Sequence, residues 1–361
     1  MAGAETGSDN DPLLIEWVAT RLGFERIANI LPWNVYPPYL LVASGLLLDY
    51  GVVDSYNYFI SGRSSIVSDP ISSVIPVGII LGVVGIRWMR DAYADAVTDL
   101  RISDRETSTR TETDRFTPII PFRYKLGAYG IGVALFYGNL FILLGLSRVL
   151  AIEGVVSTVL LNFFVIPLVY APLIIEFALL YIGVHFLLPR RIAHADLELF
   201  YYDPRNMGGF ATVGRLLKRS YYLFTAGLLL YFALLYAPVI FPVIPTPYPE
   251  PEPIAAVVFS GIWLVGLSSI GYSMYRIHMV MKRKKETKIR ELEDEIRELL
   301  DNPYDINTSH LADADKREEI QHRLTQIKGT REYPSTFTMW SQIALSVLLP
   351  QALNLAVQAA P

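Results

Sequence analysis

Long apolar runs alternate with short charged ones along the whole chain. Seven of these runs supply at least the ~20 residues that a helix needs to cross ~30 Å of hydrocarbon. They cover residues 35–55, 70–90, 124–148, 155–188, 219–244, 254–277 and 335–358. The pattern predicts an all-α membrane protein with seven transmembrane helices.

The composition agrees with that class and removes several others. Hydrophobic residues make up 52% of the 361 residues and charged residues 18%, and the mean hydropathy is +0.34, whereas a soluble domain would carry more charge. We therefore expect a multi-pass protein of the cell membrane, with the lipid bilayer as a partner. The pI near 5.8 argues against a nucleic-acid partner, because such domains are strongly basic. The chain contains no cysteine, which excludes disulfides and cysteine-ligated metals.

The basic residues predict the orientation in the membrane. Four segments together hold 29 of the 31 Lys and Arg residues, and they are residues 1–34, 87–125, 189–220 and 276–333. Positive charge is retained on the cytoplasmic side of a membrane, so these segments are expected to face the cytoplasm. This places the N-terminus in the cytoplasm and the C-terminus outside the cell.

Four parts follow from this pattern. Residues 1–34 form a tail with an interfacial amphipathic helix over 12–31, and residues 35–275 form a six-helix transmembrane bundle. Residues 276–333 form a cytoplasmic helical hairpin between spans six and seven, and residues 334–361 contain the seventh helix.

The predicted hairpin has a regular apolar seam. Apolar residues recur at alternating three- and four-residue steps, which is the spacing of coiled-coil core positions. The seam consists of Ile289, Leu292, Ile296 and Leu299, and after a break at Asn302-Pro303 it resumes with Ile320, Leu324 and Ile327. Two helices with such seams are expected to pack against each other.

The last apolar run carries a stripe of polar residues. At 100° per residue, four hydroxyl and amide side chains fall within an arc of about 80° on one helix face, and a further amide follows beyond Pro350. These residues are Ser335, Thr338, Gln342, Ser346 and Asn354. Such side chains either bridge neighbouring helices or line a water-filled pore. A pore of this kind, without any charged residue, would discriminate poorly between ions.

Span four contains ionisable groups at membrane depth. A buried charge in lipid is costly, so Glu176 is a candidate functional residue by default. Asn162 lies about 40° away around the same helix and could share a cavity with it. The alternative places Glu176 near the cytoplasmic end of the span, where it meets water or a basic partner. His185 is expected at the membrane edge.

Three further polar residues fall in the outer half of spans three and four. They are Tyr137, Asn139 and Tyr170. They either line a pocket for a small molecule together with Asn162 and Glu176, or act as buried structural hydrogen-bonding groups.

Enzymatic motifs are absent from the sequence. It contains no HExxH, no G-x-S-x-G, no phosphate-binding loop and no dinucleotide-binding glycine pattern. We therefore expect no enzymatic activity, no catalytic residue, no cofactor and no metal.

The architecture resembles the seven-transmembrane ligand-gated ion channels that include the insect odorant and gustatory receptors. The resemblance rests on seven spans, the orientation, a long fourth span and the charged helical insert before span seven. The stretch "TFTMWSQI" supports it, because the family's last helix opens with Thr-Tyr, five apolar residues and Gln-Phe. Here the spacer is one residue shorter, Phe337 stands in place of Tyr, and Ile343 in place of the second aromatic residue.

The resemblance implies a homotetramer with a weakly selective cation pore lined by four copies of the last helix. It also implies a cytoplasmic anchor built partly from residues 276–330, and a small-molecule site among spans two to six. Two other functions stay open from the residues alone. One is a secondary transporter, and the other is a non-conducting scaffold or sensor that acts through the hairpin.

Overall fold

The structure is a computed structural model that describes residues 12–33, 35–62, 69–102, 116–195, 197–236, 253–305 and 314–334. Every regular element in these ranges is a helix. In chain order they are α1 (Leu14–Arg21), α2 (Phe24–Ile30), α3 (Pro37–Leu46), η1 (Leu47–Val53), α4 (Asp54–Tyr56), η2 (Asn57–Ser61), η3 (Pro70–Ser73), α5 (Val74–Asp99), α7 (Phe122–Gly138), η5 (Asn139–Leu144), α8 (Leu146–Glu153), α9 (Val155–Ser157), η6 (Thr158–Tyr170), α10 (Ala171–Ile182), η7 (Gly183–Leu187), α11 (Leu188–His194), α12 (Ala211–Leu235), α14 (Pro253–Glu298) and α15 (Ala314–Gly329).

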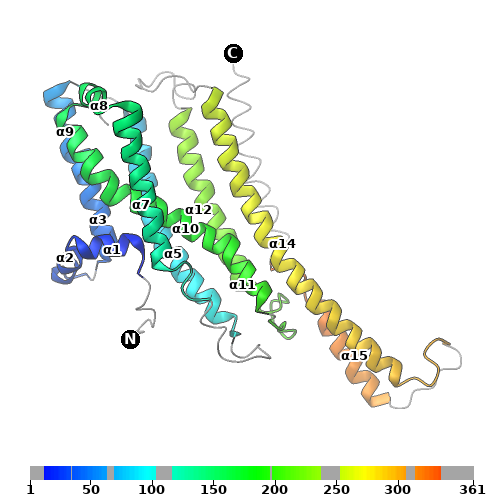
Figure 1. Cartoon of the computed structure of the whole chain (residues 1–361). Coiled ribbons are helices and arrows are strands. Elements are labelled where there is room, and N and C mark those ends of the chain that lie inside the picture. Colours follow the sequence, from blue (N-terminus) through cyan, green and yellow to red (C-terminus); the bar gives the residue numbers. More distant parts are fainter. Residues whose placement is uncertain are drawn as a thin grey trace.

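The long helices stand side by side in one bundle, and α14 projects well beyond it (Figure 1). The projecting part of α14 carries α15 along its side. We call this end of the molecule the hairpin end, and we call the opposite end, which carries η1, α8 and α9, the distal end. The short helices α1 and α2 lie across the bundle rather than along it.

Four of the described helical runs are long and apolar enough to cross a membrane. They are Pro70–Asp99, Phe122–Leu144, Val155–His194 and Val257–Glu298. An all-helical fold with four helices long and apolar enough to span a membrane is therefore confirmed for the described part of the chain. The predicted span 35–55 corresponds to the run from α3 to η2, and the predicted span 219–244 corresponds to α12. Neither of these is among the four helical runs named above. The predicted span 335–358 lies outside the described residues. Seven spans and their orientation stay predictions.

Two helices are longer than the sequence pattern indicates. The fourth run continues from Val155 to His194 through several changes of helical pitch, among them the π-helical η6 around Pro167. Proline has no N–H to donate, and a wider helical turn is one way to accommodate that loss. Helix α14 runs without a break over 46 residues, so the predicted boundary at residue 275 lies inside one continuous helix.

The N-terminal segment differs from the single amphipathic helix predicted over 12–31. It forms two helices separated at Gly23, whose backbone has φ +85°, a conformation that glycine adopts without strain. Leu14 and Ile15 are fully buried in the bundle, whereas Ile27 is half exposed. The apolar residues of this segment therefore face two directions, which one straight helix could not provide.

The hairpin forms as its seam predicts. Leu292 on α14 and Ile320 and Ile327 on α15 are buried together, and the remaining seam residues pack around them. Tyr201, from the connection between α11 and α12, joins the same cluster. The hairpin is thereby joined to the bundle as well as to itself.

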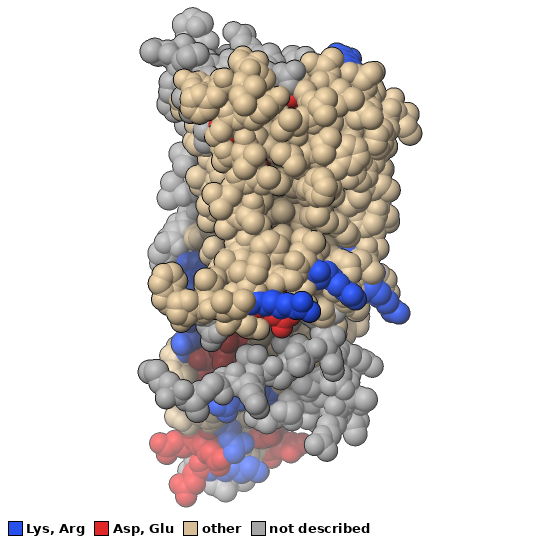
Figure 2. Space-filling view, turned by 90° about the vertical axis from the view of Figure 1, so that its left-hand side faces the viewer, with Lys and Arg blue, Asp and Glu red and all other residues tan. Residues whose placement is uncertain are grey.

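The surface seen in Figure 2 is almost free of charge over the height of the bundle. Lys and Arg side chains gather along its margin toward the hairpin end. Many large apolar side chains of the bundle are exposed, for example Ile142 at 81% and Leu135 at 70%. An apolar belt with a basic margin is the surface expected of a protein that lies in a bilayer.

Candidate functional site

The predicted pore-lining residues Ser335, Thr338, Gln342, Ser346 and Asn354 lie outside the described residues. The structure does describe the five residues that lead into them, Thr330–Pro334, which we call the strap. The strap runs from the end of α15 to the side of α14 and α12.

Helix α14 holds the strap by its side chains. The Nζ of Lys285 donates to the carbonyl oxygens of Thr330 and Lys328, at 2.7 and 3.1 Å. The Nδ1 of His278 lies 2.9 Å from the carbonyl oxygen of Glu332, and since a carbonyl only accepts, this nitrogen carries a hydrogen. The ring of Tyr333 stacks on the ring of His278 with centroids 4.0 Å apart and planes within 6°.

The far side of the strap meets helix α12 and the loop before it. The backbone N–H of Arg331 donates to the carbonyl oxygen of Asn206 at 2.7 Å. Pro334 lies so close to Gly214 of α12 that a Cβ there would be 1.7 Å from the Pro334 carbonyl oxygen. Glycine is therefore required at position 214. The contacts fix where the chain leaves the hairpin and turns toward residue 335.

The loop that supports the strap is organised by Asp203. Its carboxylate accepts hydrogen bonds from the backbone N–H groups of Arg205, Met207 and Gly209, at 2.9, 3.1 and 3.0 Å. Burial alone would raise the pKa of Asp203, but these three hydrogen bonds and the charge of Arg205 outweigh it and hold the pKa below its usual value. Asp203 therefore acts as a loop organiser in its ionised form.

Glu176 of α10 forms an ion pair with a residue of another helix. Its carboxylate lies 3.3 Å from the Nζ of Lys125 on α7, and the two side chains are 0% and 3% exposed. It also accepts a hydrogen bond from the backbone N–H of Leu14, at the start of α1. Lys125 in turn donates to the carbonyl oxygen of Pro12 at 3.4 Å. The predicted basic partner of Glu176 is thus Lys125, and the pair attaches the N-terminal helix to the bundle.

A second carboxylate secures the other side of α1. Glu16 accepts from the guanidinium of Arg90 on α5 at 2.6 Å and from the hydroxyl of Tyr36 at 2.5 Å. It also caps its own helix by accepting from the backbone N–H of Leu13. A carboxylate in the first helical turn is favourable for the helix dipole as well. Helix α1 is therefore tied to helices α5, α7 and α10.

The remaining predicted ligand residues do not gather with Glu176. The hydroxyl of Tyr170 donates to Asp49 of η1 at 2.6 Å, and the amide of Asn162 donates to Glu153 of α8 at 2.9 Å. Both contacts lie toward the distal end. Asn162 precedes Glu176 by 14 residues, about 20 Å along the helix. The cavity that the two residues were expected to share is therefore not formed by these contacts.

Tyr137 and Asn139 also lie toward the distal end. The ring of Tyr137 stacks with those of Phe141 and Phe163, with centroids 5.9 and 5.7 Å apart. Asn139 begins the π-helical η5 and is exposed. Tyr137 thus joins the third and fourth helical runs through Phe163, whereas Tyr170 and Asn162 bind η1 and α8, and Asn139 is exposed.

His185, which the sequence places at the membrane edge, is fully buried inside the bundle. Its Nε2 lies 2.9 Å from the hydroxyl of Ser220 on α12, and its Nδ1 lies 3.3 Å from that of Ser273 on α14. A neutral imidazole has one N–H donor and one acceptor nitrogen. One serine can donate to the ring while the other accepts from it, so a neutral ring satisfies this site.

Tyr181, one turn before His185, extends the same network. Its hydroxyl lies 2.7 Å from that of Ser269 on α14, and its ring lies 4.3 Å from the imidazole centroid. The arrangement joins the fourth helical run to α12 and α14 by uncharged groups. It leaves no side chain directed at a cavity.

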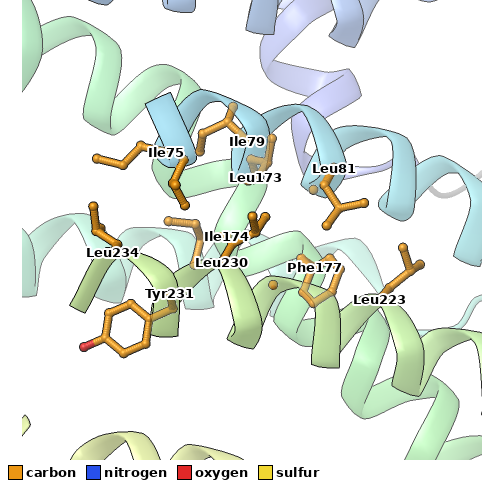
Figure 3. Close-up of a pocket in the computed structure, with 14 residues that line it drawn as sticks. Ile75, Ile79, Leu81, Leu173, Ile174, Phe177, Leu223, Leu230, Tyr231 and Leu234 are labelled. Atoms are coloured by element: carbon orange, nitrogen blue, oxygen red, sulfur yellow. The ribbon is translucent and has the colours of Figure 1, made fainter. Parts of the chain in front are cut away.

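An apolar groove runs between α5, α10 and α12 (Figure 3). It has a volume of about 280 Å³ and is lined by Val74, Ile75, Gly78, Ile79, Leu81, Gly82, Leu173, Ile174, Phe177, Leu223, Gly227, Leu230, Tyr231 and Leu234. A second cavity of about 270 Å³ is lined by Trp88, Arg219, Tyr222 and Leu223. Leu223 lines both, so the two cavities are neighbours along α12.

The sequence carried signals for some of these features. Glu176 is the lone charged residue of its apolar run, which indicates that it needs a basic partner. Gly78 and Gly82, four residues apart on α5, indicate a close helix contact. Nothing in the sequence indicates that Tyr333 would stack on His278, because 55 positions separate them.

The described ranges contain no group of three or more His, Asp or Glu side chains placed to hold a metal ion. Comparison with protein-family models, with curated proteins and with solved structures finds no match to this chain.

Proposed function

We propose that this chain is one subunit of a homotetrameric, weakly selective cation channel of the cell membrane. The observation that carries the proposal is the uncharged polar stripe of residues 335–358. Lipid offers no partner for hydroxyl and amide groups, so a stripe that runs along an otherwise apolar helix has to face water or protein. Four such helices around an axis would provide a water-filled path for ions.

The strap supports this arrangement. It is held on α14 through Lys285 and His278 and on α12 through Gly214. A pore helix needs a fixed starting point so that its polar face is presented in one direction. The hairpin of α14 and α15 would then serve as the anchor that joins subunits on the cytoplasmic side.

The charge distribution supports cation selectivity and the proposed orientation. In the proposed topology the hairpin end, with its basic margin (Figure 2), faces the cytoplasm. The described residues of the distal end include Asp49, Asp54, Asp69 and Glu153, against one basic residue, Arg148. An excess of carboxylates near the outer mouth favours the approach of cations over anions.

A small-molecule ligand would bind in the distal half of the bundle. The stacked ring of Tyr137 and the polar groups of Asn162 and Tyr170 combine apolar surface with a few orienting groups, as ligand sites do. Glu176 is not part of this proposed site, because it lies about 20 Å along the helix from Asn162 and is paired with Lys125.

The test is cation flux through the full-length protein in liposomes. In Gln342→Leu an amide on the stripe is replaced by an apolar group, and a loss of about 1.4 kcal/mol of ion stabilisation is enough to lower flux about tenfold. Val347→Ala, on the opposite, apolar face of the same segment by helical spacing, is the matched control and is expected to conduct as the unchanged protein does. Undiminished flux in Gln342→Leu would place the stripe away from the conduction path.

Two other functions remain as outcomes of the same experiment. Stoichiometric, saturable uptake by a monomer would indicate a secondary transporter. A protein that carries no ions in any assembly state would indicate a scaffold or sensor acting through the hairpin. The buried pair of Glu176 and Lys125 does not favour transport, because it binds the backbone of α1 near the hairpin end.

A further inference from the structure

The groove between α5, α10 and α12 is apolar for most of its length and basic at one end. Among its lining residues only Tyr231 has a polar side chain, and that side chain is 40% exposed at the rim. Toward the hairpin end, Leu223 also lines the neighbouring cavity, whose other lining residues include Arg219. An occupant therefore needs a long apolar part and a head that matches a guanidinium.

The basic end has the chemistry of a lipid-headgroup site. The guanidinium of Arg219 lies over the ring of Trp88, 5.9 Å from its centroid, and Lys218 lies over Tyr222 at 5.7 Å. Arg219 is exposed, and no carboxylate lies within ion-pair distance of it in the part of the chain that the structure describes. Arginine binds phosphate by paired, charge-assisted hydrogen bonds, and tryptophan and tyrosine favour the headgroup level of a bilayer.

The length of the groove fits an acyl chain. Arg219 and Leu234 are 15 residues apart on α12, which is about 22 Å at 1.5 Å per residue. One leaflet of hydrocarbon is about 15 Å deep, so a chain that starts at Arg219 would reach past the bilayer midplane. Glycine at positions 78 and 227 keeps the walls of the groove open: a Cβ at Gly227 would have no neighbour within 4 Å, and one at Gly78 only Leu230 at 3.9 Å.

We propose that this groove is a binding site for an anionic phospholipid, with one acyl chain between α5, α10 and α12 and the phosphate at Arg219. The site is independent of conduction, because it is defined by residues of α5, α10 and α12. Occupancy of this site would depend on the fraction of anionic lipid in the membrane, and the bound lipid would influence how α5 and α12 pack.

The experiment is native mass spectrometry of the full-length protein in mild detergent. The probes are phosphatidylglycerol and phosphatidylcholine with identical acyl chains. The unchanged protein is expected to retain one phosphatidylglycerol per chain in preference to phosphatidylcholine. Arg219→Gln should weaken phosphatidylglycerol retention about tenfold, as the loss of one charge-assisted contact implies, and should abolish the preference between the two lipids. Gly227→Leu should lose both lipids, because the side chain fills the groove.

The controls separate this site from general lipid adhesion. Arg123 is an exposed arginine that also lies over an aromatic ring, that of Tyr124, at 4.8 Å, and Gly130 likewise has no neighbour within 4 Å of a Cβ. Arg123→Gln and Gly130→Leu are expected to retain lipid as the unchanged protein does, and Arg219→Lys should keep most of the anionic preference. Equal retention of both lipids by the unchanged protein, or equal losses in the control variants, would overturn the proposal.

Discussion

Two fully buried polar residues on the fourth helical run, Glu176 and His185, differ in how their burial is compensated. They are nine residues apart in the sequence, and both side chains are 0% exposed. Glu176 is paired with the opposite charge of Lys125 and with a backbone N–H of α1. His185 is surrounded by the uncharged hydroxyls of Ser220 and Ser273.

The difference reflects what each residue joins. Glu176 attaches a short helix that lies across the bundle and has only a limited apolar surface to hold it there. A charge pair supplies a strong and specific attachment, although its desolvation cost is high. His185 lies between long helices that already pack over most of their length. Neutral hydrogen bonds there fix the register of the helices and add little energy.

The largest effect is expected from Glu176→Gln. Glutamine keeps an acceptor for the Leu14 N–H but leaves Lys125 buried without a counter-charge, which typically costs about 3–5 kcal/mol. We expect a large fall in thermal stability in detergent, and faster hydrogen exchange confined first to α1.

The double variant Glu176→Gln/Lys125→Met tests the cause. It removes both charges, so it should recover much of the lost stability. If the two residues did not interact, the losses of stability measured for Glu176→Gln and for Lys125→Met would simply add up in the double variant. That result would show the assigned pairing to be wrong.

A smaller effect, with a pH signature, is expected from Asp203→Asn. Here asparagine keeps one acceptor oxygen for the backbone N–H groups that bind Asp203, so the loss is expected to be of the order of one hydrogen bond to a charged group, about 1.5–3 kcal/mol. Because the pKa of Asp203 is lower in the folded protein, its contribution is present above the unfolded-state pKa and is lost as the pH falls through the folded-state pKa.

The measurement is the difference in melting temperature between the unchanged protein and Asp203→Asn over a range of acid pH. The difference should be largest near neutrality and should shrink as the pH falls below the ordinary pKa of an aspartic acid, about 3.9. Asp301→Asn, at an exposed position beyond α14, serves as the control. A difference that is constant with pH would show that the charge of Asp203 does not contribute.

The smallest effect is expected from Ser220→Ala. Hydrogen bonds between membrane helices contribute about 0.6 kcal/mol on average, and the neutral ring of His185 keeps Ser273 as a partner. Thermal stability should therefore fall only slightly, and by clearly less than in Asp203→Asn. A loss as large as that of Glu176→Gln would mean that His185 carries a charge and that the contrast between the two residues is wrong.

Periodicity predicted the helices of this fold better than it predicted their ends. The seam of Leu292 and Ile320 indicated the hairpin because one face of each helix is apolar at regular steps. The break at Gly23 was missed, since apolar residues continue past it at helical spacing. The unbroken course of α14 through residue 275 was missed as well, because a change from apolar to charged residues marks the edge of a membrane and not the end of a helix.

Contacts between distant segments were only partly predictable. A lone carboxylate such as Glu176 in an apolar span demands a partner, so the existence of a basic contact could be anticipated. The identity of Lys125, and the role of both residues in holding α1, depends on how three helices pack. The strap and the groove at Arg219 depend on packing alone, and neither leaves a pattern in the local sequence.

The most direct measurement of the central claim is the reactivity of single cysteines in the last apolar run. The natural chain has no cysteine, so each introduced thiol reports alone. In the full-length protein in liposomes, a water-soluble cationic thiol reagent should modify cysteines at Thr338, Gln342 and Ser346 and block cation flux. Cysteines at Ala344 and Val347, on the opposite face by helical spacing, should stay unmodified. Modification of the second pair, or protection of the first three, would contradict a water-filled path along the stripe.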